Sequence, residues 1–495
     1  MGPGLIAAIL IGTNIRMSLF VRLVRAVFTF GVIFASYMVQ LGLVKVFRRW
    51  RNDPEANREE SVMPGWLVRR QERVDQKNAS RLLAGMLKLG GVYIKLGQVL
   101  SIMGGFLPAA YTKELESLQD AVPPHPFDDI ERVFVESLEA RPETFFESID
   151  REPVAAASLG QVHVAYMPDG RKVAVKVLYP GIRGIVRTDL RVVKLMIRIY
   201  KWFFPVENIE VVHESLVDLL RRETNYIHEA ECMRRMSANF ADDDHMLFPE
   251  VVDEVTTRDV LTMTFMEGIK ITRLDDIKAE GVDLRKLAER LVKSFYKQVF
   301  VDRFFHADPH PGNFLVQPVE GSDDAKIVVL DFGAISEVSK VTVFGMVDVL
   351  RGFFEQNDQL VLEGIEAMGF VADGADRGLL EQTVKTYFRK LLKLEARTPA
   401  ALMSANSKEL EALADPEVER RELRTLMRSV HYPEGWFYVE RASVMMFWLA
   451  GQIAPDLDQV QVGFPYVLPL LSARLQSTRP SRPPDSPAQP AASGG

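Results

Sequence analysis

The chain has 495 residues, of which 47% are apolar and 26% are charged, and its formal net charge is −7. This length and apolar content suffice for two or more domains with substantial cores. The negative net charge gives no support for nucleic-acid binding, and the single cysteine, Cys232, excludes an intramolecular disulfide.

Residues 1–50 are predicted to be a hydrophobic membrane-anchor segment. No acidic residue precedes Asp53, and the 19 residues from Ala26 to Val44 carry no charge. As a helix this run is about 30 Å long, the thickness of a bilayer's hydrocarbon core. Three interpretations stay open: a transmembrane helix, an in-plane or hairpin anchor, and a transit-peptide-like leader. The basic residues after the run favour the inner membrane of a bacterium, with the rest of the chain in the cytoplasm; a mitochondrial or plastid membrane is the alternative.

The next segments are expected to be a linker and a helical extension. Residues 51–76 are polar and charged, and residues 77–150 contain helical patterns near 79–103, 110–121 and 127–139.

The first candidate nucleotide-binding residues lie around an apolar strand that ends at Lys176. Its ammonium can reach the α- and β-phosphates of a nucleotide. The candidate carboxylate that holds this lysine is Glu229, in an amphipathic run from Val211 to Met236. Because Ala carries a Cβ where kinases place Gly, the loop before the strand is expected to flex less around phosphates. Its candidate contacts are Ala155, Ala156, Ala157 and Ser158.

A further strand is expected from residue 260 to residue 265. It carries two candidate nucleotide contacts, Met263 and Phe265, and leads into a hinge at Glu267 and Gly268. The hinge divides a kinase-like N-lobe from a C-lobe. The C-terminal end of the chain is rich in Pro, Ser and Ala, which is typical of disorder. The corresponding boundaries are 151–267 for the N-lobe, 268–475 for the C-lobe and 476–495 for the tail.

The most specific pattern is formed by Asp308, Asn313 and Asp331, which stand five and 23 residues apart. In kinase-like sites an Asp at the first position orients the nucleophile, and the Asn and second Asp ligate Mg²⁺. The spacing therefore predicts a site for ATP or ADP with Mg²⁺. A helical pattern follows from near Val338, which leaves no long activation segment to dock a peptide substrate. This absence argues against phosphorylation of other proteins.

Taken together, these motifs resemble the UbiB/AarF-domain family of atypical kinases across roughly residues 80 to 370. The resemblance implies a two-lobed, kinase-like α+β fold and a role in isoprenoid-quinone (ubiquinone-type) or other lipid metabolism. It also implies that Lys95 and Gln98, in the K-x-G-Q helix, gate the active site together with Glu223.

The chain departs from the family pattern at two places. Asn225 stands where the family's E-x-D motif, here beginning at Glu223, has an Asp. An Asn keeps an oxygen ligand but lacks the charge, which predicts weaker metal affinity or a weaker contact with Lys95. Beyond the K-x-G-Q helix, Met103 and Gly105 replace a charged pair.

The sequence therefore predicts a membrane-associated atypical kinase or ATPase. Two other functions stay open, namely a small-molecule phosphotransferase and a nucleotide-binding scaffold without turnover. The expected partners are membrane lipids, isoprenoid-quinone precursors, lipid-biosynthesis proteins and a second copy of the chain, but no nucleic acid.

Overall fold

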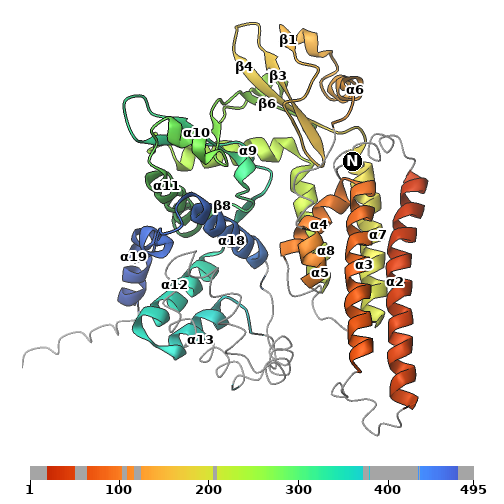
Figure 1. Ribbon diagram of the computed structural model, residues 1–495. Coiled ribbons are helices and arrows are strands. Elements are labelled where there is room, and N and C mark those ends of the chain that lie inside the picture. Colours follow the sequence, from red (N-terminus) through yellow and green to blue (C-terminus); the bar gives the residue numbers. More distant parts are fainter. Residues whose placement is uncertain are drawn as a thin grey trace, which may run out of the picture. The chain divides into compact units, whose positions relative to one another are not determined.

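The computed structural model describes residues 19–50, 64–102, 109–115, 124–203, 209–371 and 435–477, with the single residues 378 and 433. The chain forms two compact units (Figure 1). Unit 1 consists of Met1–Ile271, Gly312–Gln317 and Lys326–Ile335, and unit 2 consists of Thr272–Pro311, Pro318–Ala325 and Ser336–Gly495. Several predictions lie outside the described residues: the linker up to residue 63, the departures at Met103 and Gly105, the side chain of Gln98, and the tail beyond residue 477.

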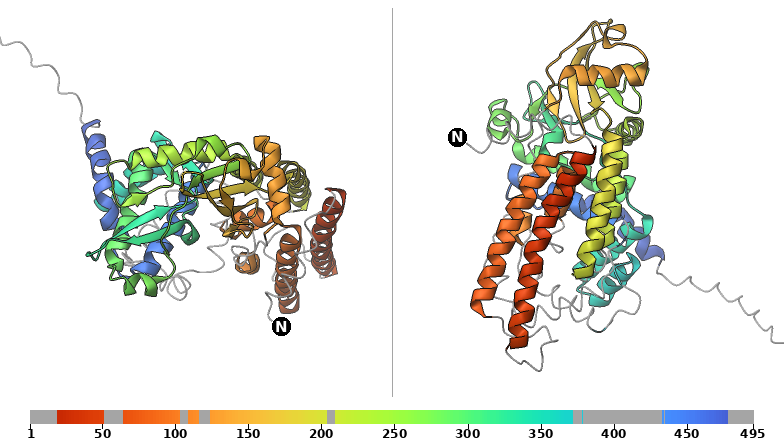
Figure 2. Two further views of the ribbon diagram at one scale, coloured as in Figure 1. Left: turned by 90° about the horizontal axis from the view of Figure 1, so that it is seen from above. Right: turned by 90° about the vertical axis from the view of Figure 1, so that its right-hand side faces the viewer.

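Unit 1 contains long helices and most of the strands. Its helices are α2 (Leu19–Trp50), α3 (Gly65–Leu89), α4 (Val92–Ile102), α5 (Ala109–Leu115), α6 (Phe127–Leu138), α7 (Ile182–Phe203), α8 (Ile209–Glu223) and α9 (Tyr226–Asn239), with short 3-10 helices η2 (Pro142–Thr144) and η3 (Asp253–Val255). Helices α2 and α3 run side by side, as Figures 1 and 2 show, and α2 also contacts α7.

Two sequence-based expectations in this unit require correction. Helix α3 begins at Gly65, so the prediction of a polar linker up to residue 76 was wrong for its last part. The first half of α3 buries little besides Leu67 before it reaches Asn78, and this leaves no apolar stripe for a periodicity argument to detect. The amphipathic run predicted from Val211 to Met236 is two helices, because the chain leaves the helical conformation between α8 and α9.

Two sheets belong mostly to unit 1. The first contains β1 (Ser148–Ile149), β2 (Ala155–Ala156), β3 (Gly160–Tyr166), β4 (Lys172–Leu178) and β6 (Val260–Thr264), and the second contains β5 (Met246–Leu247), β7 (Ile269–Lys270), β9 (Phe314–Pro318) and β10 (Ala325–Val329). Strand β4 lies antiparallel between β3 and β6, with Lys176 opposite Val162 and Leu261. Because side chains alternate along a strand, Lys176 points to the face opposite the buried Val175 and Val177.

Unit 2 is largely helical. It contains α10 (Leu274–Ala279), α11 (Leu284–Tyr296), a π-helical turn η4 (Lys297–Asp302), β8 (Phe304–His306), α12 (Lys340–Glu355), α13 (Asp358–Ala367), α18 (Trp436–Ile453) and α19 (Gln459–Ser477); β11 (Ile335–Glu337) pairs with β8. Helix α11 contacts α18 and α19. Where α19 meets α11 the chain needs Gly463, because a Cβ at this position would lie 2.3 Å from the Tyr296 ring.

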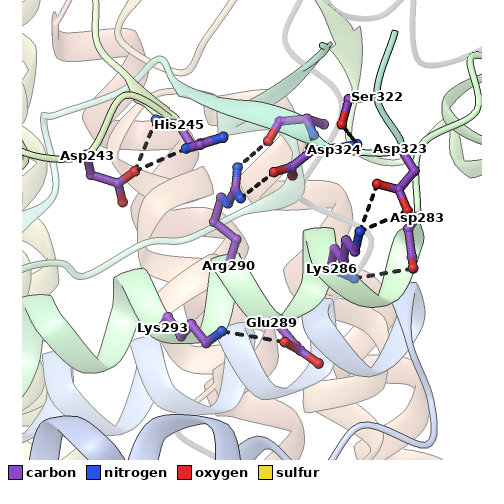
Figure 3. A network of polar contacts seen from close by, with 11 residues as sticks. Asp243, His245, Asp283, Lys286, Glu289, Arg290, Lys293, Ser322, Asp323 and Asp324 are labelled. Atoms are coloured by element: carbon purple, nitrogen blue, oxygen red, sulfur yellow. Dashed lines mark hydrogen bonds and ion pairs between the residues drawn. The ribbon is translucent and has the colours of Figure 1, made fainter. Parts of the chain in front are cut away.

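A polar network fixes the loop between β9 and β10 to α11 (Figure 3). Lys286 Nζ lies 2.8 Å from both carboxylate oxygens of Asp323. Arg290 donates to Asp324 Oδ2 at 2.9 Å and to the carbonyl oxygen of Ala325 at 2.6 Å. The loop is therefore held by charged pairs in addition to the backbone bonds of its strands.

Candidate functional site

Lys176 lies at the centre of a charged cluster in unit 1. Its Nζ atom lies 2.6 Å from Glu229 Oε1 and 3.3 Å from Asp331 Oδ1. The lysine side chain is 17% exposed, that of Glu229 is 1% exposed, and that of Asp331 is 39% exposed. One ammonium therefore faces two carboxylates, and the cluster opens to solvent on the Asp331 side.

Helix α9 brings Glu229 to this position. The helix begins at Tyr226, so Glu229 occupies its first turn, where the helix dipole stabilises a negative charge. Tyr226 is on the same side of the helix, three residues earlier, and Lys176 Nζ lies 5.3 Å from the centroid of its ring. The lysine is thus held by a buried carboxylate and by an aromatic face from one helical turn.

Burial changes the pKa values of this cluster. For Glu229, desolvation raises the pKa of the carboxyl from 4.5 to about 7, Lys176 lowers it, and Asp331 raises it further. For Lys176, desolvation opposes the charged form, but Asp331 and Glu229 outweigh it and raise its pKa well above its ordinary value. The lysine therefore stays protonated at neutral pH, whereas Glu229 is close to its titration point.

Three acidic side chains lie close to Gly333. A Cβ on this glycine would lie 3.4 Å from Asp331 Oδ1, 3.5 Å from Glu229 Oε2 and 3.7 Å from Glu223 Cγ. The Gly333 amide also donates to Asp331 Oδ1 at 3.1 Å. These are ordinary van der Waals distances, so the three acidic side chains line the space next to Gly333 without excluding a Cβ there.

Asn313 lies at the start of β9, beside the end of β10. The 3-10 helix η5 (Pro311–Asn313) leads directly into β9. The Leu330 amide donates to the Asn313 carbonyl at 3.0 Å, one residue before Asp331. The pairing of these two strands therefore brings the backbone of the predicted Asn close to that of the predicted metal-binding Asp.

A second lysine reaches the cluster from the K-x-G-Q helix α4. Lys95 Nζ lies 2.6 Å from Glu223 Oε1, and both side chains are mostly buried. Asn225, at the N-cap of α9, has an extended backbone, and its buried Oδ1 has no hydrogen-bond partner among the described residues. The structure therefore brings together Lys95, Glu223 and the Lys176 cluster. The unpaired acceptor, Asn225 Oδ1, belongs to the residue two positions after Glu223.

The Ala-rich loop is a tight hairpin. Strand β2 pairs with β3, with Ala155 opposite Val162 and Ala156 opposite Gln161. The Ala157 amide donates to the Gly160 carbonyl at 2.8 Å, which closes the turn around Ser158. Tyr179, just beyond β4, fixes the hairpin from outside, because its hydroxyl donates to the Ala157 carbonyl at 3.1 Å.

The two predicted contacts on the 260–265 strand differ in exposure. Met263 lies on β6 opposite Ala174 and is buried. Phe265 follows the strand, is partly exposed, and stacks under Lys172, whose Nζ lies 4.1 Å from the ring centroid. Met263 is thus part of the sheet's packing, and Phe265 marks the edge of the sheet.

Asp308 belongs to unit 2, in the loop after β8. Its amide donates to Nδ1 of the buried His306 at 3.2 Å. Its carboxylate lies 2.7 Å, from Oδ1 to Nη2, from Arg441 on α18. This arginine could not be predicted from the sequence, because a single Arg in an apolar helix far along the chain carries no recognisable spacing.

A metal site made of protein ligands alone is not found in the described part of the chain. Within it, no three Asp, Glu, His or Cys side chains are arranged to hold an ion. Kinase-type Mg²⁺ sites take only one or two protein oxygens and complete their coordination with phosphate oxygens and water. Asn313 and Asp331 suit such a shared site.

Comparison with known proteins identifies the family. The profile of the ABC1 atypical kinase-like domain matches residues 117–365, just over half of the chain. The chain belongs to the ABC1 family of atypical kinase-like proteins. The resemblance predicted from the motifs is thereby confirmed, and so is the kinase-like fold with mixed helix and sheet content. The arrangement of two lobes stays a prediction.

Individual relatives of this ABC1-family chain are moderately similar. An uncharacterized protein in the hydrogenase 1 5' region of Clostridium pasteurianum is 29% identical over 81% of this chain and 73% of its own length. A probable protein kinase UbiB from Marinobacter nauticus is 33% identical over 62% of this chain and 56% of its own. A solved complex of Rv3197 with erythromycin from Mycobacterium tuberculosis is 23% identical, over 78% of this chain and 97% of that one, with a TM-score of 0.45. The chain thus spans just over half of the UbiB relative.

Proposed function

We propose that this ABC1-family chain binds Mg²⁺-ATP or Mg²⁺-ADP and catalyses ATP hydrolysis or phosphoryl transfer. The observation that carries the proposal is the contact of one buried lysine, Lys176, with Glu229 and Asp331. An ammonium that stays charged and is fixed from two sides is suited to bind the α- and β-phosphates. A free surface lysine would have to be ordered each time a nucleotide bound.

The other residues take roles that follow from their chemistry. Asp331 and Asn313 supply hard oxygen ligands for Mg²⁺ shared with the phosphates. Asp308 accepts a hydrogen bond from the attacking hydroxyl or water. The Ala155–Ala156 strand and its turn cover the phosphates, and Phe265 lies where a nucleobase could stack. Met263, being buried, would support this surface from beneath.

We further propose that Lys95 restricts which acceptor can enter. Its contact with Glu223 places a helix carrying a fixed positive charge beside the acidic cluster. An α4 helix held there leaves less room for an extended peptide, which supports a small-molecule acceptor or water over other proteins. A role in isoprenoid-quinone or related lipid metabolism is part of the proposal, and its support is the name UbiB carried by two relatives.

Membrane attachment is proposed for α2. Among the described residues, one helix, Val21–Phe47, is long and apolar enough to cross a membrane. Its polar residues turn inward: Ser36 accepts a hydrogen bond from Asn78 at 2.5 Å, and Tyr37 donates to Asp75 at 2.5 Å. Its exposed face is apolar, with Phe28 71% exposed.

Helix α3, which packs against α2, decides between a spanning helix and an attachment to one leaflet. The first part of α3, up to Arg81, carries many charged side chains, among them Arg70, which binds Gln40 of α2. A spanning α2 would take these charges into the hydrocarbon or lose its contacts with α3, and both are costly. We therefore favour a helical hairpin that inserts the exposed face of α2 into one leaflet of a membrane.

The nucleotide proposal is tested with Asp331→Asn. A ligand at 100 times its Kd stabilises a protein by about 2.7 kcal/mol, and this stabilisation appears as a higher Tm. The wild-type chain should show such a shift with Mg²⁺-ATP, and the variant should lose most of it, because the removed charge faces both Mg²⁺ and Lys176. Thermal unfolding with and without Mg²⁺-ATP measures the shift.

A matched control is Asp323→Asn, which removes a carboxylate paired with a lysine in the exposed loop of Figure 3. It should lower the Tm slightly and leave the nucleotide shift intact. An unchanged shift in Asp331→Asn would contradict the metal assignment. A shift without any ATP turnover in the wild-type chain would favour the nucleotide-binding scaffold, to which the Asn225 departure also points.

A further inference from the structure

Asp308 is paired with a buried arginine from the C-terminal part of unit 2. Arg441 Nη2 lies 2.7 Å from Asp308 Oδ1. The arginine side chain is 5% exposed and that of Asp308 is 17% exposed, so water screens the contact only weakly. Both residues belong to unit 2, and the contact joins the loop after β8 to helix α18.

The surroundings make this arginine unusual. Arg441 is the one basic residue of α18, a helix rich in aromatic and aliphatic side chains, and its neighbour Ala442 is fully buried. Its Nε atom is buried and has no hydrogen-bond partner among the described residues. A buried guanidinium with an unmet donor costs free energy that an apolar side chain would not cost. The pair is therefore poorly explained as a stabilising contact.

We propose that Arg441 is a positioning residue for Asp308 in phosphoryl transfer. By binding Oδ1, the guanidinium fixes the rotation of the carboxylate, whose terminal torsion is otherwise broad. A carboxylate held in one orientation can accept the hydrogen bond of the attacking group with less reorganisation than a freely rotating one. Arginine suits this task because it stays charged at any physiological pH and its planar fork is rigid. This inference rests on the proposed function.

The step that this positioning supports transfers the γ-phosphoryl group of ATP. The oxygen of the attacking water or hydroxyl forms a bond to the γ-phosphorus of ATP. The bond from that phosphorus to the bridging oxygen breaks, and its electron pair stays with ADP. The proton of the attacking group passes through Asp308 to solvent. Arg441 forms no bond to any reacting atom, and it acts only on the orientation of Asp308.

The test is a double-mutant cycle of turnover in the full chain, with Arg441→Gln, Asp308→Asn and the combination. Misplacing a reacting group by about 1 Å can cost about a hundredfold in rate, so we expect Arg441→Gln to lower kcat by about ten- to a hundredfold. KM for ATP should change by less than about twofold, because the proposed role of the arginine is to orient Asp308 and not to bind the nucleotide. In the Asp308→Asn background the second change should cost nothing more.

Two further variants separate positioning from folding. Arg441→Lys keeps the charge without the fork and should retain part of the lost kcat. Arg290→Gln, which breaks the Arg–Asp pair of the same unit drawn in Figure 3, is the matched control. It should lower the Tm as Arg441→Gln does and leave kcat unchanged, so a loss of stability alone cannot imitate the expected result.

Three outcomes would overturn the proposal. Unchanged kcat in Arg441→Gln would remove the role outright. An equal loss in the Asp308→Asn background would show that the arginine acts through another group. A wild-type chain that binds Mg²⁺-ATP without turnover would defeat the proposed function first and the role of this pair with it, and that result needs no variant to be seen.

Discussion

Glu229 is held in a position where its charge is only partly compensated. The carboxylate is buried almost completely, and Asp331 competes with it for the same ammonium of Lys176. Its pKa is raised to about 7 by desolvation first and by Asp331 next, against the opposing effect of Lys176. A Mg²⁺ ion on Asp331 would relieve this repulsion, so the strained charge balance is itself an argument for a cation partner.

This raised pKa predicts how stability changes with pH. The folded state binds the Glu229 proton more tightly than the unfolded state, so its contribution is complete below pH 4.5 and is lost as the pH rises through 7. With about 1.4 kcal/mol for each pKa unit, the free energy of unfolding should fall by about 2–3 kcal/mol from this group between pH 5 and pH 8. Glu229→Gln should lack that fall when unfolding is measured in metal-free buffer.

The control for this prediction is Glu231→Gln on the exposed side of the same helix. Its stability should follow the wild-type pH profile. Parallel profiles for wild type and Glu229→Gln would mean that the carboxylate is ionised throughout, with Lys176 outweighing its burial.

Candidate site residues could be proposed from the sequence where a local spacing marks them. Asp308, Asn313 and Asp331 lie within one short segment, and Lys176 ends an apolar strand, so their types and distances in sequence carry the signal. Their partners were less accessible. Glu229 could be proposed only after Lys176, and Arg441 could not be proposed at all, because its contact depends on how α18 packs in unit 2.

At the scale of elements, the β2–β3 hairpin is the part whose mechanics differ most from a Gly-rich loop. Its two alanines are paired to β3, and its turn is tied to Tyr179. Replacing Ala156 with Gly adds backbone freedom that costs about 0.5–1 kcal/mol to remove. If nucleotide orders this hairpin, the affinity for ATP and ADP should fall by about two- to fivefold. Calorimetric titration of both nucleotides measures the change.

A matched control for the hairpin is Ala279→Gly, at the exposed end of α10. It adds the same freedom away from the cluster, so it should lower stability without changing nucleotide affinity. If Ala156→Gly binds both nucleotides and phosphorylates itself as the wild type does, the hairpin does not control the site.

Helices and strands were predictable where one of their faces is apolar. The prediction failed where an element makes a polar contact. The strand near residue 260 and the helix from near Val338 were found close to their observed positions, at β6 and at Lys340. The first half of α3 was taken for a linker, because its partner is the polar side of α2. The same pairing turns the polar residues Ser36, Tyr37 and Gln40 of α2 toward α3.

At the scale of the whole molecule, Arg22 connects helix α2 to helices α7 and α4. Arg22 of α2 binds Asp189 of α7, with Nε 2.9 Å from Oδ1, and it also donates to the carbonyl oxygen of Gly90, just before α4. Helix α4 carries Lys95. Because the Arg22 guanidinium carbon also lies 5.6 Å from the ring centroid of Tyr93 on α4, the helix proposed to touch the membrane contacts the helix proposed to restrict the site.

The membrane proposal predicts how the intact chain behaves on lipid vesicles. Because α2 presents an apolar face, vesicle-bound chain should stay bound in about 1 M salt, where charge attraction is screened within about 3 Å. The double variant Phe28→Asp and Val39→Asp places charges on that face and should remain in the supernatant after sedimentation. Val341→Asp, an exposed apolar position on α12, is the matched control and should bind as the wild type does.

Alkaline carbonate then separates the two forms of attachment. A hairpin lying in one leaflet, with α3 still paired to α2, should be released by carbonate, and a spanning α2 should not be. Retention in carbonate together with normal binding of the Phe28→Asp and Val39→Asp variant would contradict the hairpin. Release by salt alone would contradict both forms, because it would mean that the basic residues hold the chain and that the exposed face of α2 meets something other than lipid.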